Sequence, residues 1–210
     1  MKSRKPKKIV DPSTEEKIKN AAKIIFHRKG FAATRTRDIA LEADINLALL
    51  NYYFRSKEKL FDIIMMESFQ EFLHSVKGIF NDENTDFETK IEKIVSNYID
   101  LFINQPDIPI FLLNELRHNP EDIVSKINIK EILLKSSFLK QFNKAVKTGK
   151  IVRMSPLHFI MNLMGMTVFP FVASPVLKSL GDLSQKEFNT LMIQRKKLIP
   201  EWTKMILMIK

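Results

Sequence analysis

The sequence predicts an all-α protein made of a small N-terminal three-helix domain and a larger C-terminal helical domain. Apolar residues recur at spacings of three and four along nearly the whole chain, which is the period of helices that bury one face. Only 5 of the 210 residues are glycine, and alternating β-branched runs separated by hairpin turns do not occur. We therefore expect helices throughout and no sheet.

Four helices are expected in the N-terminal part. Ser13 can cap the first helix and Glu16 can complete its capping box, and Gly30 is expected to end it. Thr34 can cap the second helix, and Ser56 can cap the fourth. The expected ranges are residues 13–30, 34–43, 47–54 and 57–80.

Further helices are expected between the polar breaks and prolines of the C-terminal part. Thr85 and Glu88 form another capping box. Ser155 followed by Pro156 suits a helix start, because proline is tolerated in the first turn. Pro200 is expected to kink the last helix, since proline cannot donate to the helical hydrogen-bond ladder. The expected ranges are residues 85–104, 111–117, 129–147, 155–171 and 184–209.

The composition is that of a globular protein and excludes several kinds of chemistry. Hydrophobic residues make up 45% and charged residues 28% of the chain. No run of about 18 or more apolar residues is present, so no membrane span is expected. The basic start MKSRKPKKIVDPSTEEK has no apolar run behind it, so it is not a signal peptide. Without cysteine there is no disulfide, thiolate metal site or cysteine nucleophile, and the cytoplasm is the expected location.

Positive charge is concentrated in the first 60 residues. They hold 15 Lys and Arg against 7 Asp and Glu, a net charge of +8, whereas the rest of the chain holds 19 against 17. This asymmetry indicates a polyanion-binding head on a body with another task, although a lysine-rich solvated surface would give the same count. Five cations at the start form either an arm for the DNA minor groove or, as we expect, a solvated tail: Lys2, Arg4, Lys5, Lys7 and Lys8.

Residues 34–54 have the pattern of a helix-turn-helix, in which two short helices are joined by a tight turn. On the second of them, Leu50 and Phe54 lie one turn apart and are expected to face the core. The opposite face carries Leu47, Ala48, Asn51 and Tyr52. This helix has no charged residue, which fits a helix that enters the major groove, because phosphates set affinity while base edges set specificity.

The side chains of this helix and its surroundings each suit a part of the DNA. Leu47 and Ala48 can pack on thymine methyl groups, and Asn51 can pair with the N6 and N7 edge of adenine. Cations and helix N-termini beside the helix suit phosphates. The backbone contacts are expected from Thr34, Arg35, Arg55 and Lys57.

The stretch TRTRDIALEADINLALLNYYFRSKEKLF, residues 34–61, resembles the DNA-binding signature of the tetracycline-repressor (TetR) family of bacterial transcription regulators. A threonine, RDIA, an alanine before the turn, YYF and SKEKLF follow one another in the family's order and spacing. The resemblance implies that Thr34, Tyr53 and Lys57 contact phosphates. Glycine usually stands in the turn where this chain has Asp44, and aspartate tolerates the left-handed backbone of such a turn.

The predicted DNA-binding surface therefore comprises Thr34, Arg35, Asn46, Leu47, Ala48, Asn51, Tyr52, Tyr53, Arg55 and Lys57. The two tyrosines could instead only pack this helix against its neighbours. The DNA-binding domain is expected to span residues 1–56, and a ligand-binding and dimerisation domain residues 57–210.

Residues 61–210 contain no recognisable catalytic motif, and their histidines are far apart in sequence, so we expect no enzyme activity, cofactor or metal. Large apolar residues are abundant there, mostly for the core. The resemblance implies that an inducer binds between helices of the body and that the last two helices pair across a two-fold axis. A flexible Phe- and Met-rich lining would suit a small hydrophobic ligand, and the candidates are Phe102, Phe111, Phe138, Phe142, Met161 and Met164.

The sequence thus favours a homodimeric, ligand-responsive regulator of the TetR type, a repressor released from palindromic double-stranded DNA by a small hydrophobic ligand. One alternative is a small-molecule-binding helical protein with a degenerate DNA-binding head. Another is an all-α enzyme whose first 60 residues only confer solubility. Salt-dependent binding to duplex DNA would separate the first hypothesis from the other two, because phosphate neutralisation gives a steep salt slope.

Overall fold

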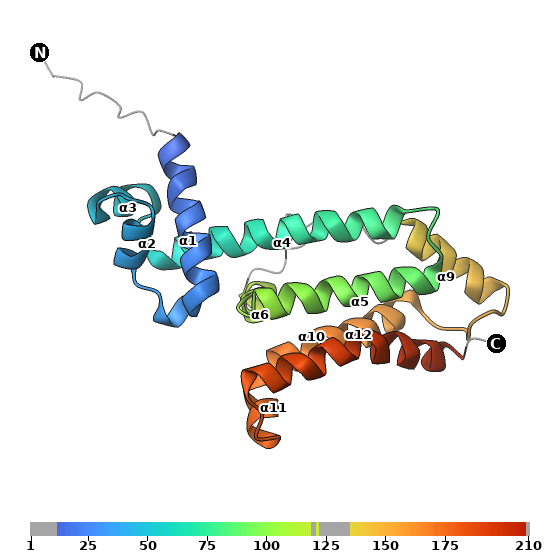
Figure 1. Cartoon of the computed structure of the whole chain (residues 1–210). Coiled ribbons are helices and arrows are strands. Elements are labelled where there is room, and N and C mark those ends of the chain that lie inside the picture. Colours follow the sequence, from blue (N-terminus) through green and yellow to red (C-terminus); the bar gives the residue numbers. More distant parts are fainter. Residues whose placement is uncertain (1–11, 119–120, 122–134, 209–210) are drawn as a thin grey trace, which may run out of the picture. The chain divides into compact units, whose positions relative to one another are not determined.

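The computed structural model describes residues 12–118, 121 and 135–208, and every regular element in these ranges is a helix (Figure 1). The all-α prediction is confirmed. The chain divides into two compact units, Met1–Ser68 and Phe69–Lys210. The basic start of the chain, Lys2 to Lys8, lies outside the described residues.

The N-terminal unit combines one long helix with two short helices that are joined by a turn. Its elements are α1 (Pro12–Ala33), α2 (Thr36–Glu42), α3 (Leu47–Phe54) and the first part of α4 (Lys57–Asn81). Gly30, where the sequence predicts the first helix to end, has a φ of 72° and interrupts α1 before one further turn. Glycine is favoured there because a left-handed φ strains residues with a Cβ atom.

Helix α2 begins one residue later than predicted, since its N-cap is Arg35 and not Thr34. The Arg35 backbone N–H donates to Asp38 Oδ2 (3.2 Å), so Asp38 satisfies the helix start. Asp44 takes a φ of 51° in the following turn, as predicted for an aspartate in place of glycine. The sequence also predicts the inward faces correctly, because Ile39 and Leu50 are fully buried.

Phenylalanine packing and ion pairs hold this unit together. The rings of Phe26 and Phe31 both pack on Phe61, with centroids 5.1 and 4.7 Å away. Three ion pairs then join α1 to its neighbours: Lys19 with Glu67 (2.7 Å), Arg28 with Glu42 (3.3 Å) and Lys29 with Asp38 (3.0 Å). A small core is therefore supplemented by charged contacts between helices.

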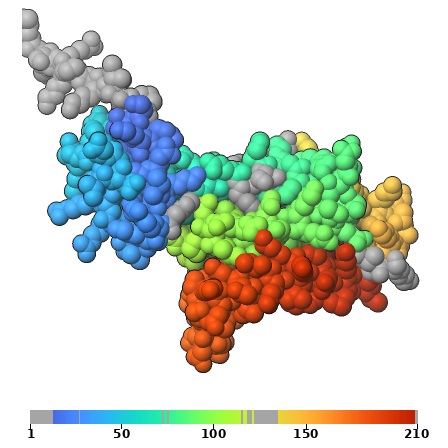
Figure 2. Space-filling view, in the orientation of Figure 1, coloured from blue at the N-terminus to red at the C-terminus, as the bar shows by residue number. Residues whose placement is uncertain are grey.

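The C-terminal unit contains longer helices. After the end of α4 come α5 (Phe87–Asn104), α6 (Ile108–His118), α9 (Ser137–Lys147), α10 (Pro156–Val172), α11 (Ser174–Leu180) and α12 (Gln185–Leu207). Helix α5 lies beside α12, and α10 packs against both (Figure 1). In the space-filling view α10 to α12 (orange to red) form one continuous band (Figure 2).

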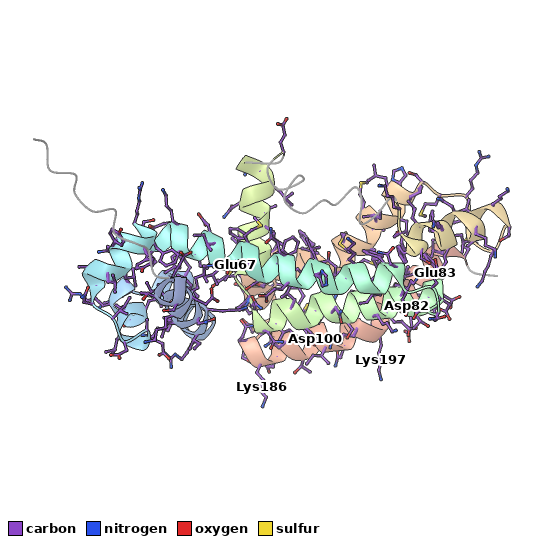
Figure 3. All side chains as sticks on the ribbon, turned by 90° about the horizontal axis from the view of Figure 1, so that it is seen from above. Glu67, Asp82, Glu83, Asp100, Lys186 and Lys197 are labelled. Carbon is purple, nitrogen blue, oxygen red and sulfur yellow. The ribbon has the colours of Figure 1, made fainter. Side chains whose placement is uncertain are left out.

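Several predicted boundaries in this unit are wrong. Asp86, not Thr85, is the N-cap of α5, and its Oδ1 accepts from Thr89 N (2.7 Å). The preceding loop contains Asp82 and Glu83 (Figure 3). The Thr85 hydroxyl pairs with Asp82 in this loop, so Thr85 does not cap the helix. Helix α6 starts at Ile108 rather than Phe111, which places Pro109 in its first turn.

The predicted helix over residues 129–147 is also shorter than expected. Ser136 caps α9 and its hydroxyl accepts from Leu139 N (3.2 Å), so this helix begins at Ser137. The predicted start at Ile129 lies outside the described residues. Sequence reasoning missed α11, a short helix that starts at Ser174 and has Pro175 in its first turn. The starts at Ser155 and at Ser184, with its capping box, are confirmed.

Two groups of aromatic rings form much of the core of the C-terminal unit. The larger group consists of Phe80, Phe87, Phe138, Phe142 and Phe159. The other consists of Tyr98, Phe102, Phe171 and Phe188. No single helix in the described ranges is long and apolar enough to cross a membrane, and α10 reaches that length only together with α11, across a bend of 70°.

Candidate DNA-binding surface

Helix α3 has one face in the core and one in solvent. Leu50 and Phe54 are 0% and 5% exposed, and they anchor the helix as predicted. The predicted base-reading face is accessible, because Ala48 and Asn51 are exposed and Leu47 is half-buried. Tyr52 is 52% exposed. The helix thus presents small and uncharged polar groups, which can approach base edges closely.

The start of α3 is held by Asn46. Its side-chain oxygen accepts from Leu49 N (2.8 Å), which satisfies one of the free N–H groups at the helix start. The Asn46 NH₂ group has no hydrogen bond to any described residue. Asn46 therefore stabilises the start of α3, and its NH₂ group is a hydrogen-bond donor that DNA can use there.

The two tyrosines differ in exposure. Tyr53 is half-buried, whereas Tyr52 is exposed, and their rings meet edge to face with centroids 5.6 Å apart. The Tyr53 ring also lies 6.4 Å from that of Phe54. Packing thus fixes Tyr53 more firmly than Tyr52.

Lys57, a predicted phosphate contact, is engaged within the protein. Its Nζ donates to the backbone oxygens of Phe31 (3.0 Å) and Thr34 (3.1 Å) and lies 4.1 Å from the centroid of the Phe31 ring. An ammonium group has three N–H bonds, so one remains for a phosphate. Lys57 thereby ties the start of α4 to the junction of α1 and α2, a role that sequence reasoning missed.

The other predicted backbone contacts fall into two classes. Thr34 is only 2% exposed, and its hydroxyl donates to Gly30 O (2.7 Å). Arg35 and Arg55 are exposed. Arg37 in the first turn of α2 is a further exposed cation, and it was not predicted as a DNA contact. Its position two residues after Arg35 was the sequence feature that could have indicated it.

Asp38 lies close in sequence to Arg35 and Arg37, and its carboxylate is paired within the protein. The hydrogen bond from Lys29, followed by the one from the Arg35 backbone N–H, lowers the pKa of Asp38. The carboxylate is thus ionised at neutral pH and satisfied by groups of the protein.

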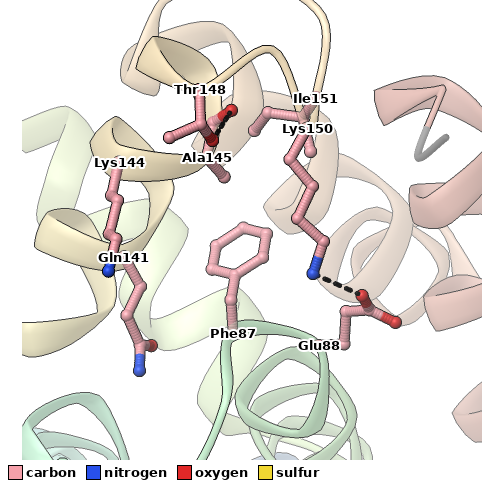
Figure 4. A pocket seen from close by; sticks show the side chains of 8 residues that line it. All are labelled: Phe87, Glu88, Gln141, Lys144, Ala145, Thr148, Lys150 and Ile151. Carbon is pink, nitrogen blue, oxygen red and sulfur yellow. Dashed lines mark hydrogen bonds and ion pairs between the residues drawn. The ribbon is translucent and has the colours of Figure 1, made fainter.

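The residues predicted to bind a ligand are divided between several places. Phe138 and Phe142 come together in the larger aromatic group, and Phe102 lies in the other. Phe111 is buried, Met164 is half-buried and Met161 is 53% exposed. One hollow of about 190 Å³ lies between the start of α5 and the end of α9 (Figure 4), and another of about 400 Å³ lies between α5 and α12. None of the six predicted residues lines either hollow.

A comparison with known protein families finds a match within the N-terminal unit. Residues 18–64 match the family model of bacterial regulatory proteins of the tetR family. The chain belongs to the TetR family. The matched residues contain α2, α3 and the start of α4, which are the elements that carry the predicted surface.

Two curated relatives of this TetR-family chain are themselves regulators. The "Probable HTH-type transcriptional regulator YttP" of Bacillus subtilis is 24% identical over 167 residues, which cover 76% of this chain and 78% of the relative. The "HTH-type transcriptional repressor NicS" of Pseudomonas putida is 29% identical over 105 residues, which cover 50% of this chain and 49% of the relative. The chain is a TetR-type transcriptional regulator with a helix-turn-helix.

Solved structures share the fold over nearly the whole TetR-family chain. A TetR transcription regulator from Haloarcula marismortui has a TM-score of 0.61 and 16% identity, and the match covers 91% of this chain and 98% of that one. The regulator FadR from Bacillus subtilis in complex with stearoyl-CoA has a TM-score of 0.54 and 18% identity, with 88% and 96% covered. At these identities the likeness concerns the fold alone.

Proposed function

We propose that this TetR-family regulator is a cytoplasmic, homodimeric repressor that leaves a palindromic operator when a small hydrophobic ligand binds. The observation that carries the proposal is helix α3, whose buried Leu50 and Phe54 fix an exposed, uncharged face with Asn51 at its centre. Such a face reads bases, while cations beside it bind phosphates. NicS is named a repressor, and FadR was solved with an acyl-CoA, which supports both halves of the proposal.

Roles on the DNA divide by chemistry. We assign Leu47, Ala48 and Asn51 to base edges, with the apolar pair on thymine methyls and the amide on adenine. The phosphate contacts are assigned to Arg35, Tyr53, Arg55 and Lys57, and Tyr52 lies on the exposed face with Asn51. Because the Thr34 hydroxyl is used by Gly30, its contribution is to hold the start of α2 in place. We assign residues 1–56 to DNA binding and residues 57–210 to ligand binding and dimerisation.

The dimer is proposed to form through α10 and α12. Leu191, Leu198 and Met205 repeat every seven residues on α12, and all are exposed. On α10, Leu157, Met161 and Phe169 are 64%, 53% and 62% exposed at spacings of four and eight. A soluble chain that exposes such aligned apolar side chains is expected to cover them, and a two-fold axis would let one copy cover the other.

The ligand site is proposed to lie among Met164 and the predicted aromatic residues of the C-terminal unit, because Met161 belongs to the proposed dimer face. Buried Phe102 and Phe111 are suited to an acyl or similarly apolar chain. Stearoyl-CoA, the molecule in the FadR structure, is the first probe. Its binding should lower DNA affinity, and DNA should lower affinity for the probe by the same factor, because coupling between two binding sites is reciprocal.

Gel-shift titration on an operator selected from genomic fragments tests the DNA-binding half. Asn51→Ala is expected to cost about 1–3 kcal/mol on the selected site and almost nothing on a scrambled duplex, as a base contact should. Equal losses on both duplexes would show that Asn51 does not read bases. Absence of any salt-dependent duplex binding by the native protein would favour a degenerate DNA-binding head instead.

Sedimentation equilibrium tests the dimer. The native chain should sediment at about twice its 24.5 kDa mass, and Leu198→Glu should shift it to monomer, because a carboxylate would be buried in an apolar interface. Leu41→Glu is the matched control, since Leu41 is 83% exposed on α2 and lies outside the proposed interface. A monomeric native protein at micromolar concentration would overturn this part of the proposal.

A further inference from the structure

The hollow between the start of α5 and the end of α9 combines an aromatic floor with a cationic rim. It measures about 190 Å³, and its apolar lining comes from Phe87, Ala145 and Ile151. In Figure 4 the Phe87 ring stands between Lys144 on one side and Lys150 on the other. Both lysines are exposed, and Phe87 is half-buried. This volume is below the ~300 Å³ at which sites for drug-sized ligands begin, so an occupant must be small.

A third cation lies behind the wall of this hollow. Lys90 is 0% exposed, and its Nζ donates to Ser137 Oγ (3.2 Å) and to Oε1 of Gln141 (3.0 Å), a lining residue. It forms no ion pair with the described carboxylates, although Asp82, Glu83 and Asp86 act on it from a distance. Burial lowers the pKa of Lys90. A buried ammonium without a paired carboxylate makes its surroundings favourable to an anion.

Gln141 connects Lys90 to the hollow. Its Oε1 must face the Lys90 ammonium because an ammonium group cannot accept a hydrogen bond. Its Nε2 therefore points the other way and donates to Thr85 O (3.0 Å). The amide has two N–H bonds, and only one of them is used in this contact. The remaining N–H is a donor on a wall that already favours negative charge.

Glu88 is the one lining carboxylate among the described residues of this hollow, and it is already paired. Its Oε2 lies 3.2 Å from Lys204 Nζ, whereas its Oε1 lies 3.6 Å from Lys150 Nζ. The shorter pair with Lys204 would persist if Lys150 turned to a ligand. Lys150 is therefore a cation that an anion can recruit without leaving Glu88 unpaired.

We propose that this hollow binds a small carboxylate with a flat or short apolar body, at a site that shares no lining residue with the proposed hydrophobic ligand site. The apolar body packs on Phe87 and Ile151, and the carboxylate lies between Lys144 and Lys150. A small charged molecule without an apolar body would make no contact with the aromatic floor, and a neutral apolar molecule would gain nothing from Lys144 and Lys150. The combination therefore selects an amphipathic monoanion.

Isothermal titration of the full-length protein with benzoate tests this site, with benzamide as a neutral molecule of the same shape. Benzoate should bind saturably, and benzamide should bind at least about tenfold more weakly, as for loss of a charge-assisted contact. Lys144→Met and Lys150→Met should each weaken benzoate binding by about tenfold. Lys147→Met is the matched control, because Lys147 is an exposed lysine of α9 that does not line the hollow, and it should bind benzoate as the native protein does.

Three results would overturn the proposal. They are the absence of saturable benzoate binding, equal affinity for benzoate and benzamide, and equal weakening by Lys147→Met and Lys150→Met. Circular dichroism of each variant verifies that it is folded, and ring-proton saturation-transfer NMR detects benzoate binding if its heat is small. DNA binding of the same preparations is measured separately, so failure of this site leaves the assignment as a regulator unaffected.

Discussion

The two units of the chain are stabilised in different ways. In Met1–Ser68, α2 and α3 have 7 and 8 residues, and ion pairs such as Arg28 with Glu42 connect helices around a small core. In Phe69–Lys210, helices of up to 23 residues pack through two groups of aromatic rings. Ion pairs join helices of the second unit as well, such as Lys204 of α12 with Glu88 of α5 (3.2 Å), so the difference lies in the extent of the aromatic packing and not in the presence of charged contacts.

Lys57 and Lys90 also differ between the units, in the partners of their hydrogen bonds. Lys57, in the first unit, donates to two backbone oxygens and fixes the approach of α4 to the junction of α1 and α2. Lys90, in the second, donates to two side chains of α9 and is fully buried. Neither uses a carboxylate. In one unit the lysine holds the backbone near the DNA-binding surface, and in the other it places a charge behind a hollow.

The largest expected effect is on the aromatic core of the second unit. Phe142→Ala removes a ring that is 1% exposed and packs on Phe87 and Phe159. We expect it to cost about 3–5 kcal/mol of unfolding free energy, as large-to-small core changes do. Phe61→Ala in the first unit should cost less, because Phe61 is half-buried. Urea unfolding measures both, and a larger loss for Phe61→Ala would contradict the comparison.

The next effect separates two roles of Lys57. Lys57→Met keeps most of the apolar stem but removes both hydrogen bonds to backbone oxygens, so a loss of about 1.5–3 kcal/mol is expected. Lys59→Met, two residues along α4 and exposed, should change stability by less than about 0.5 kcal/mol. Thermal unfolding without DNA provides the measurement. Unchanged stability with weakened DNA binding would mean that Lys57 acts only on phosphates.

Helix caps allow a smaller, matched test of the two units. Ser136→Ala removes a cap that is 1% exposed at the start of α9, and Asn46→Ala removes an exposed cap at the start of α3. Loss of a cap costs about 0.5–2 kcal/mol, and we expect Ser136 at the upper end because its neighbours cannot turn to water. Denaturant midpoints compare the two variants, and a larger cost at Asn46 would reverse the expected order.

The smallest effect concerns pH and the ion pairs of the first unit. Because the folded-state pKa of Asp38 is lowered, its contribution to stability is present above the unfolded pKa of about 3.9 and is lost as pH falls through the lower folded value. Asp38→Asn should therefore lower the melting temperature at neutral pH and flatten its decline below about pH 4. Melting curves at several pH values provide the test. An unchanged acid profile would show that this ion pair contributes nothing measurable.

Much of the geometry of the candidate DNA-binding surface could be predicted from sequence because its signals are local. The spacing of Leu50 and Phe54 predicts which face of α3 is buried, and Asp44 was correctly expected to tolerate a left-handed turn. The N-cap of α2 was misplaced by one residue because Thr34 and Arg35 both precede the helix, and only the bond from Arg35 N to Asp38 decides between them.

Tertiary structure alone decided which polar groups are paired and which apolar side chains are exposed. Lys57 reaches oxygens 26 and 23 residues away, and Lys90 reaches side chains 47 and 51 residues away. No local pattern encodes such partners. Likewise Phe102 is buried while Phe169 is 62% exposed, although both lie on apolar helices. Helix starts and faces follow from the residues nearest in the chain, whereas burial depends on which distant helices pack together. The sequence by itself therefore determined the fold class and the exposed face of α3. The packing of the helices decided where the hollow forms and which apolar side chains are exposed.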